Sequence, residues 1–419
     1  MVRSAPVPWY REVNARQWRA LWAGFLGWTL DGFDFTILTF VLVDIQKSFT
    51  IDSALAGALG TVTLLMRLVG GVAAGTAADR WGRKLPLMLS ILWFSLFSLL
   101  SGFSTSYAML FGTRALFGIG MGGEWAAAAP LVIEHWPVHL RGIASGILQG
   151  GFSWGFILAS FAFEFIYPFF ADYPELGWRA MFWLGALPAL FVLWVRGGVE
   201  ESPVWLEHQR HRADRHRRAR LPLAEILRPP LLGITIQTSL LMSGFMCSYY
   251  AMTYWYATHL RESGLAPFWY VIALNLGGVG GSILWGRLSE TRLGRRGAVT
   301  CAALLGAAVV PLYLMTTVSS WRLLGACLMG LNTAGMWGVV PTYLTERFPT
   351  AVRGAGPGCA YHVGAGFGSI TPFVIGWLYD GGMVRSDAMA LCITGAALLV
   401  ATLMWTGPET RGRTFDARA

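Results

Sequence analysis

Two acidic residues, Asp31 and Asp34, lie inside an apolar stretch that runs from residue 17 to residue 44. A carboxylate at the centre of a membrane helix costs at least about 2.5–3.5 kcal/mol, so its presence there indicates a function. The spacing of three residues puts both side chains on one helical face. A desolvated carboxylate near a cation can take up and release a proton. The pair is therefore a candidate proton-coupling site, with Asp31 as first choice and a static ion pair as the alternative.

Two cations have similar apolar surroundings, Arg67 within residues 53–78 and Arg114 within residues 107–134. A guanidinium group does not deprotonate, and it can hold a carboxylate through two parallel hydrogen bonds. We predict that Arg114 binds a carboxylate ligand, with Arg67 as the second candidate. Structural pairing with the two aspartates is the alternative, and the two roles are compatible if an arginine exchanges partners.

A third buried acid is expected at Glu124, ten residues after Arg114 in the same apolar stretch. Ten helical residues span about 15 Å, so the two side chains should not contact the same ligand group. A proton relay and a buried, hydrogen-bonded glutamate both remain open for Glu124.

The second half of the chain offers neutral polar side chains in apolar stretches. Tyrosine and asparagine can hydrogen-bond the hydroxyl or keto groups of a ligand, although packing is the commoner role of a single aromatic residue. A histidine can titrate near neutrality, but a satisfied core histidine is the favoured reading. The candidate ligand-binding residues are Tyr249, Tyr254, Asn275, Asn332, Tyr361 and His362.

The composition shows what must position these groups. Of 419 residues, 55% are hydrophobic and only 13% are charged, against about 25% charged in soluble domains. The mean hydropathy is +0.51, and apolar stretches of about 20 residues recur along the chain. We therefore expect an all-α polytopic membrane protein. Neither a nucleophile–base pair nor metal-ligand spacing is evident, so we expect no enzyme, no metal and no cofactor. The net charge of +9 is explained by cytoplasmic loops rather than by nucleic acid.

The apolar stretches predict twelve transmembrane helices, with ends defined to within several residues. A polar, basic segment separates the first six from the last six. We expect a six-helix bundle over residues 1–196, a cytoplasmic basic linker over 197–230, and a second bundle over 231–419. The predicted spans are 17–44, 53–78, 84–104, 107–134, 142–168, 178–196, 231–260, 266–288, 297–317, 320–346, 354–380 and 387–406.

The distribution of basic residues predicts the orientation. If the N-terminus is cytoplasmic, 25 of the 32 lysines and arginines lie in cytoplasmic segments and five lie in segments on the outer side of the membrane. The remaining two, Arg67 and Arg114, lie within predicted spans. Basic residues concentrate on the cytoplasmic side of membrane proteins. Both termini are therefore expected in the cytoplasm, in a multi-pass protein of the cytoplasmic (inner) membrane.

Three landmark pairs repeat at an offset of about 210 residues. GTAADRWGRK, residues 75–84, corresponds to GRLSETRLGRR, residues 286–296. Glu134-x-x-Pro137-x-x-x-Arg141-Gly142 corresponds to Glu346-x-x-Pro349-x-x-x-Arg353-Gly354. Glu201-Ser202 corresponds to Glu409-Thr410. The two halves are therefore predicted to be parallel six-helix repeats.

These motifs resemble those of the major facilitator superfamily, whose parallel halves are a known arrangement. The resemblance covers essentially the whole chain. Residues 31–35 (DGFDF), 66–71 (MRLVGG) and 114–146 resemble the sialate/monocarboxylate:proton symporter family, which includes lactate and pyruvate carriers. DGFD also occurs in aromatic-acid:proton symporters.

The resemblance implies proton-coupled import of an organic carboxylate by alternating access. The site would lie between the halves and be lined by spans one, four, seven and ten. We expect protons as the coupling ion, a lipid bilayer around the chain, a carboxylate substrate such as sialic acid or a monocarboxylate, and a monomer. The alternatives are an aromatic-acid:proton symporter, an exporter of drugs or metabolites, and a membrane sensor that does not transport.

The resemblance also implies a gate. In the family, the acidic residue of the first loop motif meets the start of span eleven and helps lock the outward-facing state. We expect gate residues in each half, with one departure, because the second loop has a glutamate where the first has an aspartate. They are Asp79, Arg80, Arg83, Glu134 and Arg141 in the first half, and Glu290, Arg295, Glu346 and Arg353 in the second.

Overall fold

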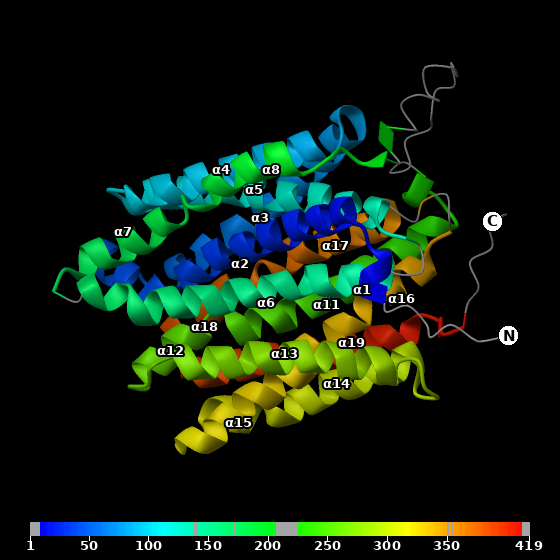
Figure 1. Cartoon of the computed structure of the whole chain (residues 1–419). Helices are drawn as coiled ribbons and strands as arrows, with labels where there is room; N and C mark the ends of the chain where they lie inside the picture. Colours follow the sequence, from blue (N-terminus) through cyan, green and yellow to red (C-terminus); the bar gives the residue numbers. More distant parts are fainter. Residues whose placement is uncertain are drawn as a thin grey trace, which may run out of the picture.

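The protein is a bundle of long helices in the computed structural model (Figure 1). The structure describes residues 9–137, 141–170, 172–203, 205–206, 225–349, 352 and 355–412, and within these ranges every regular element is a helix. The expectation of an all-α fold is therefore confirmed.

The first half contains the helices up to residue 198. Their bounds are α1 Trp9–Glu12, α2 Ala15–Phe49, α3 Ser53–Trp81, α4 Lys84–Gly102, α5 Tyr107–His135, α6 Arg141–Phe165, the 3-10 helix η2 Tyr167–Phe170, α7 Pro174–Leu184 and α8 Pro188–Gly198.

The second half begins at residue 231. Its first elements are α11 Leu231–Thr253, α12 Tyr256–Glu262, α13 Phe268–Leu288, α14 Gly294–Val310, the π-helix η3 Pro311–Met315, and α15 Ser319–Met329. They are followed by the π-helix η4 Gly330–Ala334, the 3-10 helix η5 Gly335–Gly338, α16 Val340–Arg347, α17 Ala355–Gly368, α18 Thr371–Asp380 and α19 Arg385–Thr406.

Ten of the described segments are long and apolar enough to cross a membrane. Helix α6 and the pair α17–α18 occupy the positions of predicted spans five and eleven. The described helices thus group into the twelve predicted segments, and the polytopic fold class is confirmed. The predicted linker lies mostly in residues 207–224, outside the described residues, so its limits at 197 and 230 stay a prediction.

Local sequence explains where the first helices begin. Asn14 caps α2 by accepting a hydrogen bond from the backbone of Gln17, and the Gln17 side chain bonds back to Asn14. Asp52 caps α3 through Leu55 at 2.7 Å, and Ser106 caps α5. Such caps satisfy amide groups that the helix itself leaves unpaired.

Small residues let helices of the same half approach closely. A Cβ at Gly122 of α5 would collide with the carbonyl oxygen of Arg67 in α3. A Cβ at Gly330 would collide in the same way with the carbonyl oxygen of Leu274 in α13. Glycine at such crossings is typical of membrane helices. It fixes α3 against α5 in the first half and α13 against the η4 region in the second.

The two sides of the bundle can be told apart by the helix ends. We call the side where α2 begins and α19 ends the terminal side, and the side where α2 ends and α19 begins the opposite side. In Figure 1, α1 and α16 lie toward the terminal side at the right, and α7 and α12 lie toward the opposite side at the left.

The outer surface of the bundle carries many apolar side chains. Leu193 is 68% exposed, Trp269 is 66% exposed and Trp377 is 61% exposed. Extended apolar surface of this kind is unusual on a soluble monomer and fits contact with lipid.

A central cavity between the two helical halves

A cavity of about 800 Å³ lies between the two halves. This volume is typical of sites for small molecules. The first half contributes Trp22, Phe25, Trp28, Arg67, Ile147, Gln149, Gly150, Phe152, Ser153 and Trp154. The second half contributes Met246, Tyr249, Tyr250, Gly278, Val279, Ser282, Ile283, Ala334, Trp337, Gly338, Thr342 and Tyr361.

Helix α5, which is span four, supplies none of the described lining residues, although a site lined by spans one, four, seven and ten was expected. Helix α5 packs against α2 and α3, and its Trp125 stacks behind the Tyr361 ring of the wall at 4.6 Å. The wall instead takes residues from α3, α6, α13 and α17 in addition to spans one, seven and ten.

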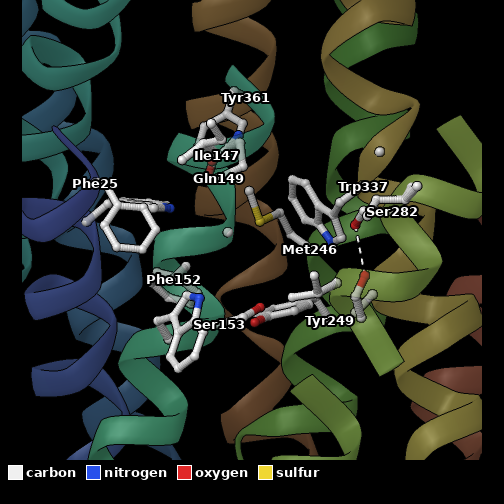
Figure 2. Close-up of a pocket in the computed structure, with 18 of the residues that line it drawn as sticks. Phe25, Ile147, Gln149, Phe152, Ser153, Met246, Tyr249, Ser282, Trp337 and Tyr361 are labelled. Carbon is white, nitrogen blue, oxygen red and sulfur yellow. Dashed lines mark hydrogen bonds between the residues drawn. The ribbon is translucent and has the colours of Figure 1, made fainter. Parts of the chain in front are cut away.

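Five aromatic side chains form a continuous chain around the cavity. We call Trp28, Phe152, Tyr249, Trp337 and Tyr361 the aromatic collar. Successive ring centroids are 4.9 Å, 6.4 Å, 6.0 Å and 6.2 Å apart. Figure 2 shows Phe152 on one side of the space and Tyr249 and Trp337 on the other. The collar therefore joins both halves of the protein.

Arg67 closes the collar between its first and last members. Its guanidinium carbon lies 4.9 Å from the centre of the Trp28 ring and 5.9 Å from that of Tyr361. The residue is 3% exposed, and its Nε and Nη2 atoms have no hydrogen-bond partner within the described part of the chain. Among the described lining residues, Arg67 alone carries a charge. The geometry thus suits the reception of one anionic group.

Arg114 lies behind the cavity wall rather than in it. Its guanidinium carbon is 3.8 Å from the centre of the Phe117 ring and 5.4 Å from that of Phe182. The side chain is fully buried, and its three nitrogens lack hydrogen-bond partners among the described residues. The geometry therefore favours Arg67, the second candidate, as the group that a ligand in the cavity would meet.

The three predicted coupling acids are fully buried, and none lines the cavity. The carboxylate oxygens of Asp31 and Glu124 accept no hydrogen bond within the described residues, and the Ser98 side chain lies beside the carboxylate of Asp34. Asp31 lies within electrostatic range of Arg67 and Arg114. The carboxylate of Asp34 lies beside Gly185, at the junction of α7 and α8. A Cβ on Gly185 would collide with it.

Glu124 faces α2 rather than the cavity. A Cβ placed at Gly27 would lie 2.6 Å from its Oε1 atom. Gly27 is one helical turn before Asp31. The first half therefore gathers three acids and two arginines in its interior, on the cavity side and directly behind it.

The predicted ligand-binding residues separate into two groups. Tyr249 and Tyr361 line the cavity, as does Tyr250 next to the former. The others do not line it. Asn275 and Asn332 donate to the carbonyl oxygens of Val271 and Leu328 in their own helices, both at 2.9 Å.

Tyr254 and His362 have contacts away from the cavity. The Tyr254 hydroxyl donates to the carbonyl oxygen of Ala56 in the first half at 3.0 Å, toward the opposite side of the bundle. The His362 ring packs edge-on against Trp125 at 5.7 Å. Both positions support packing between the halves rather than contact with a ligand.

A polar cluster ties together the terminal-side ends of the first half. The Glu201 carboxylate accepts hydrogen bonds from the backbone of Arg83 at 2.8 Å, of Lys84 at 3.1 Å and of Ser202 at 2.8 Å. The Arg83 side chain pairs with Glu134 at 3.2 Å, and the Ser202 hydroxyl donates to the same glutamate. The cluster joins α3, α4, α5 and the segment after α8.

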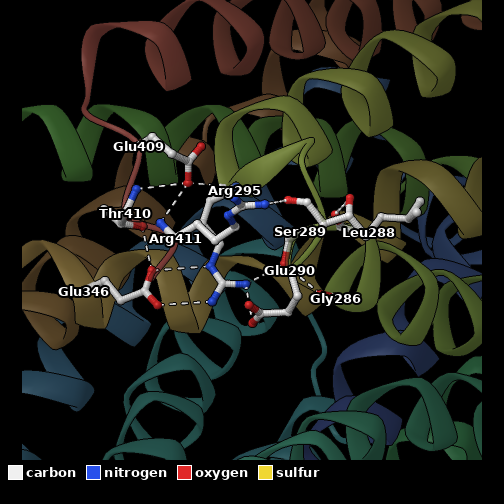
Figure 3. Close-up of polar contacts among 10 residues, drawn as sticks. Gly286, Leu288, Ser289, Glu290, Arg295, Glu346, Glu409, Thr410 and Arg411 are labelled. Carbon is white, nitrogen blue, oxygen red and sulfur yellow. Dashed lines mark hydrogen bonds and ion pairs between the residues drawn. The ribbon is translucent and has the colours of Figure 1, made fainter. Parts of the chain in front are cut away.

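The second half repeats this cluster bond for bond (Figure 3). Glu409 accepts from the backbone of Arg295, Arg296 and Thr410, each at 3.0 Å. Arg295 pairs with Glu346 at 3.1 Å, and the Thr410 hydroxyl donates to Glu346 at 2.6 Å. The internal repeat therefore extends to individual hydrogen bonds.

Burial raises the pKa of Glu409, but backbone amides of Arg411, Arg296, Arg295 and Thr410 lower it more. The net pKa is below the usual value of a glutamate. The carboxylate is thus held ionised at the centre of the second cluster. In the sequence, Glu201 and Glu409 stand out only as landmarks of the repeat, and their central place in the two hydrogen-bonded clusters was not predicted.

The remaining gate candidates differ in their contacts and in how far the structure describes them. Glu290 pairs with Arg295 at 2.7 Å, within the second half. Arg80 lies 5.8 Å above the Trp81 ring. The side chains of Asp79 and Arg141, and the whole of Arg353, lie outside the described residues. The predicted contact of the first loop with the start of span eleven therefore stays a prediction.

The two halves are fastened together on the opposite side. Asp380 of α18 accepts hydrogen bonds from the first amides of α3, Ser53 at 3.1 Å and Ala54 at 2.6 Å. Arg261 of α12 pairs with Asp44 of α2 at 3.0 Å. Toward the terminal side, by contrast, the cavity lining reaches Trp22 in α2 and Thr342 in α16, near the ends of these segments. The cavity is therefore closed on the opposite side and extends toward the terminal side.

The comparisons with known proteins cover nearly the whole chain. The family model described as Major Facilitator Superfamily matches residues 24–370. A "Probable 4-methylmuconolactone transporter" of Cupriavidus pinatubonensis is 33% identical and aligns over 96% of this chain and 93% of its own length. The "Sialic acid transporter NanX" of Escherichia coli is 32% identical, with 87% and 88% covered. A "Cis,cis-muconate transport protein" of Acinetobacter baylyi is 28% identical, with 93% and 94% covered.

A solved structure shows the same fold. The inward open xylose transporter XylE of Escherichia coli superimposes with a TM-score of 0.75 at 19% identity, covering 96% of this chain and 98% of that one. The family model and the relatives confirm the resemblance seen in the sequence, and with it the expectation that the chain is not an enzyme. The chain belongs to the Major Facilitator Superfamily and is a multi-pass membrane transporter.

Proposed function

We propose that the chain imports an organic carboxylate together with a proton across the cytoplasmic membrane. The observation that carries this proposal is Arg67, a buried cation in the wall of a cavity shared by both halves. A buried cation with unpaired N–H groups is costly, and an anionic ligand that accepts hydrogen bonds from the free Nε and Nη2 atoms would reduce that cost. Relatives with organic-acid names in their descriptions, such as muconate and sialic acid, support an acid as substrate.

The coupling proposal rests on the two buried cations that act on Asp31. Asp31 interacts electrostatically with both Arg67 and Arg114. When a substrate carboxylate pairs with Arg67, it offsets part of the attraction between Arg67 and the ionised form of Asp31, which favours the protonated form. Asp31 then takes up a proton, and substrate and proton bind together. Asp34 and Glu124, buried in the same interior, are the further candidates for carrying or relaying the proton.

Alternating access follows from the asymmetry of the two sides. The cavity extends toward the terminal side while polar contacts close the opposite side. If both termini are cytoplasmic, as the basic residues predict, this conformation faces inward. Rocking of the halves would then open the opposite side to the exterior. We propose that the chain performs this cycle as a monomer.

The test is uptake by purified protein in sealed vesicles. Labelled sialic acid, lactate and benzoate are offered separately, with and without an inwardly directed proton gradient. Accumulation of at least one acid above equilibrium, only when the gradient is present, is the expected result. Equal final uptake with and without the gradient for all three acids would contradict proton-coupled import.

A further inference from the structure

The aromatic collar is built from both halves and from five separate segments, α2, α6, α11, η5 and α17. Its rings touch one another edge to face at Tyr249–Trp337, with 81° between the planes, and at a tilt of 37° at Trp28–Phe152. Aromatic rings prefer such arrangements with further rings at centroid distances of about 4.5–7 Å. A flat ring placed inside the collar would therefore find several partners of suitable geometry.

We propose that the collar selects a planar, unsaturated monocarboxylate, with the ring or conjugated system of the substrate against the collar and its carboxylate on Arg67. This inference rests on the proposed function and narrows its substrate class. Arg67 stands between Trp28 and Tyr361, so a carboxylate bound there is attached directly to the edge of the collar.

A polyhydroxylated acid fits this wall poorly. Each hydroxyl group removed from water needs a hydrogen-bond partner in the site, because an unpaired hydroxyl lowers the binding affinity. Besides the tyrosines, the described wall offers the polar groups of Gln149, Ser153 and Thr342 and the indole N–H groups of Trp28 and Trp337, which donate to no described partner. The Ser282 hydroxyl already donates to the carbonyl oxygen of Gly278 at 2.9 Å, as Figure 2 shows. A sialic acid would have to pair each of its hydroxyl groups with this limited set, whereas a flat apolar body needs no such partners.

A small aliphatic acid fits poorly for a different reason. Lactate can reach Arg67, but its three carbons leave most of the collar and of the 800 Å³ cavity without contact. A second carboxylate would meet no second cation, because among the described lining residues Arg67 alone is charged. One negative charge on a flat apolar body therefore matches the wall best.

Trp337 is the collar member that tests this most directly. It contacts Tyr249 and Tyr361, and it belongs to the half that does not contain Arg67. Its replacement therefore removes a flat surface from the collar without touching the cation. Trp337→Leu keeps an apolar side chain, and Trp337→Phe keeps a flat one.

The experiment is isothermal calorimetry on the purified full chain at one pH, with four acids. Benzoate and cyclohexanecarboxylate share the carboxylate and the number of carbons, and differ in planarity and conjugation. Sialic acid and lactate represent the other two classes. We expect benzoate to bind about tenfold tighter than cyclohexanecarboxylate, the scale of one or two aromatic contacts, and tighter than sialic acid and lactate.

The variants assign the preference to the collar. In Trp337→Leu, the ratio between benzoate and cyclohexanecarboxylate should fall toward one, while Trp337→Phe should keep most of it. Trp321→Leu is the matched control, because Trp321 is 55% exposed on the outside of α15. It should leave the ratio unchanged.

Two results separate the inference from the function beneath it. If wild type binds cyclohexanecarboxylate as tightly as benzoate, or sialic acid or lactate more tightly, the collar proposal is overturned and carboxylate transport still stands. If none of the four acids binds or is taken up by vesicles, the proposed function fails and the collar proposal with it.

Discussion

Arg261 of α12 donates two hydrogen bonds to the carboxylate of Asp44 in α2, at 3.0 Å and 3.2 Å. A third bond, at 2.7 Å, goes to the carbonyl oxygen of Phe40 one turn earlier. The guanidinium also lies 5.3 Å from the centre of the Phe163 ring. One side chain of the second half is therefore held by two helices of the first half. Bidentate pairs of this kind combine strength with a fixed geometry.

The pair predicts a shift of conformation. Asp44→Asn removes the charge that holds Arg261, so the state closed on the opposite side should lose population. A bias of about 1–3 kcal/mol changes the ratio of states by roughly 5–150-fold. The measurement is the rate at which a cysteine at Ile147, in the cavity wall, is labelled from the terminal side in a background without native cysteines. This rate should be lower in Asp44→Asn than in wild type.

The control for this experiment is Asp387→Asn. Asp387 lies on the same side but is exposed, and among the described residues its carboxylate accepts a hydrogen bond from its neighbour Ser386 at 3.4 Å. It should label like wild type. Equal labelling of Asp44→Asn and wild type would show that the pair does not set the balance between states.

Asp31→Asn tests the coupling residue. The substitution keeps the size of the side chain but cannot bind and release a proton, so accumulation driven by a proton gradient should be lost. Counterflow exchange, which needs no net proton movement, should survive. Asp387→Asn again serves as control. Concentrative uptake at the wild-type level in Asp31→Asn vesicles would remove Asp31 from the mechanism.

The two arginines should respond differently to the same change. Arg67→Lys keeps a charge in the cavity wall but loses the planar fork, so substrate affinity should fall about tenfold or more. Arg114→Lys, behind the wall, should alter affinity much less and act on coupling through Asp31 and Asp34. Calorimetry at fixed pH compares the two. Unchanged affinity in Arg67→Ala would return the receptor role to Arg114, the first choice from sequence.

Glu409 gives a prediction about acid stability. Its pKa in the folded protein is lowered, mainly by backbone amides that outweigh its burial. A depressed pKa contributes stability above the unfolded value, about 4.3 for glutamate, and this contribution is lost as the pH falls through the folded pKa. Glu409→Gln should therefore lower Tm at pH 7, and the difference from wild type should shrink below about pH 4.

The control for Glu409 is Glu175→Gln, an exposed position in the first turn of α7. Thermal unfolding in detergent, followed by tryptophan fluorescence across pH, is the measurement. A Tm difference for Glu409→Gln that stays constant from pH 7 to pH 3.5 would mean that its charge does not brace the cluster.

The fold could be predicted because its signals are long. Apolar stretches of about 20 residues and landmark pairs such as Glu134 and Glu346 repeat over enough sequence to fix the helix count and the two halves. Breaks within helices were not predicted, as at span ten, where α15 passes through η4 and η5 before α16. Such irregular turns depend on packing rather than on local pattern.

The site was harder to predict because its main residue type is common throughout the chain. The sequence has 20 tryptophans and 25 phenylalanines. Nothing in the spacing of Trp28, Phe152 or Trp337 separates them from aromatic residues that face lipid. Asn275 illustrates a second difficulty, because a polar side chain in an apolar span can be satisfied by its own helix, and the sequence does not show whether it is. Only the packing of distant spans brings the collar together.

The duplicated clusters around Glu201 and Glu409 have a mechanical consequence. Each hydrogen bond described for them joins residues of one half, so neither cluster has to break when the halves turn against each other. Each half can then move as one rigid body, because hydrogen bonds hold its helix ends together at the terminal side. The polar contacts that form and break during the transport cycle are then those between the halves, such as Arg261–Asp44, and not those within each half.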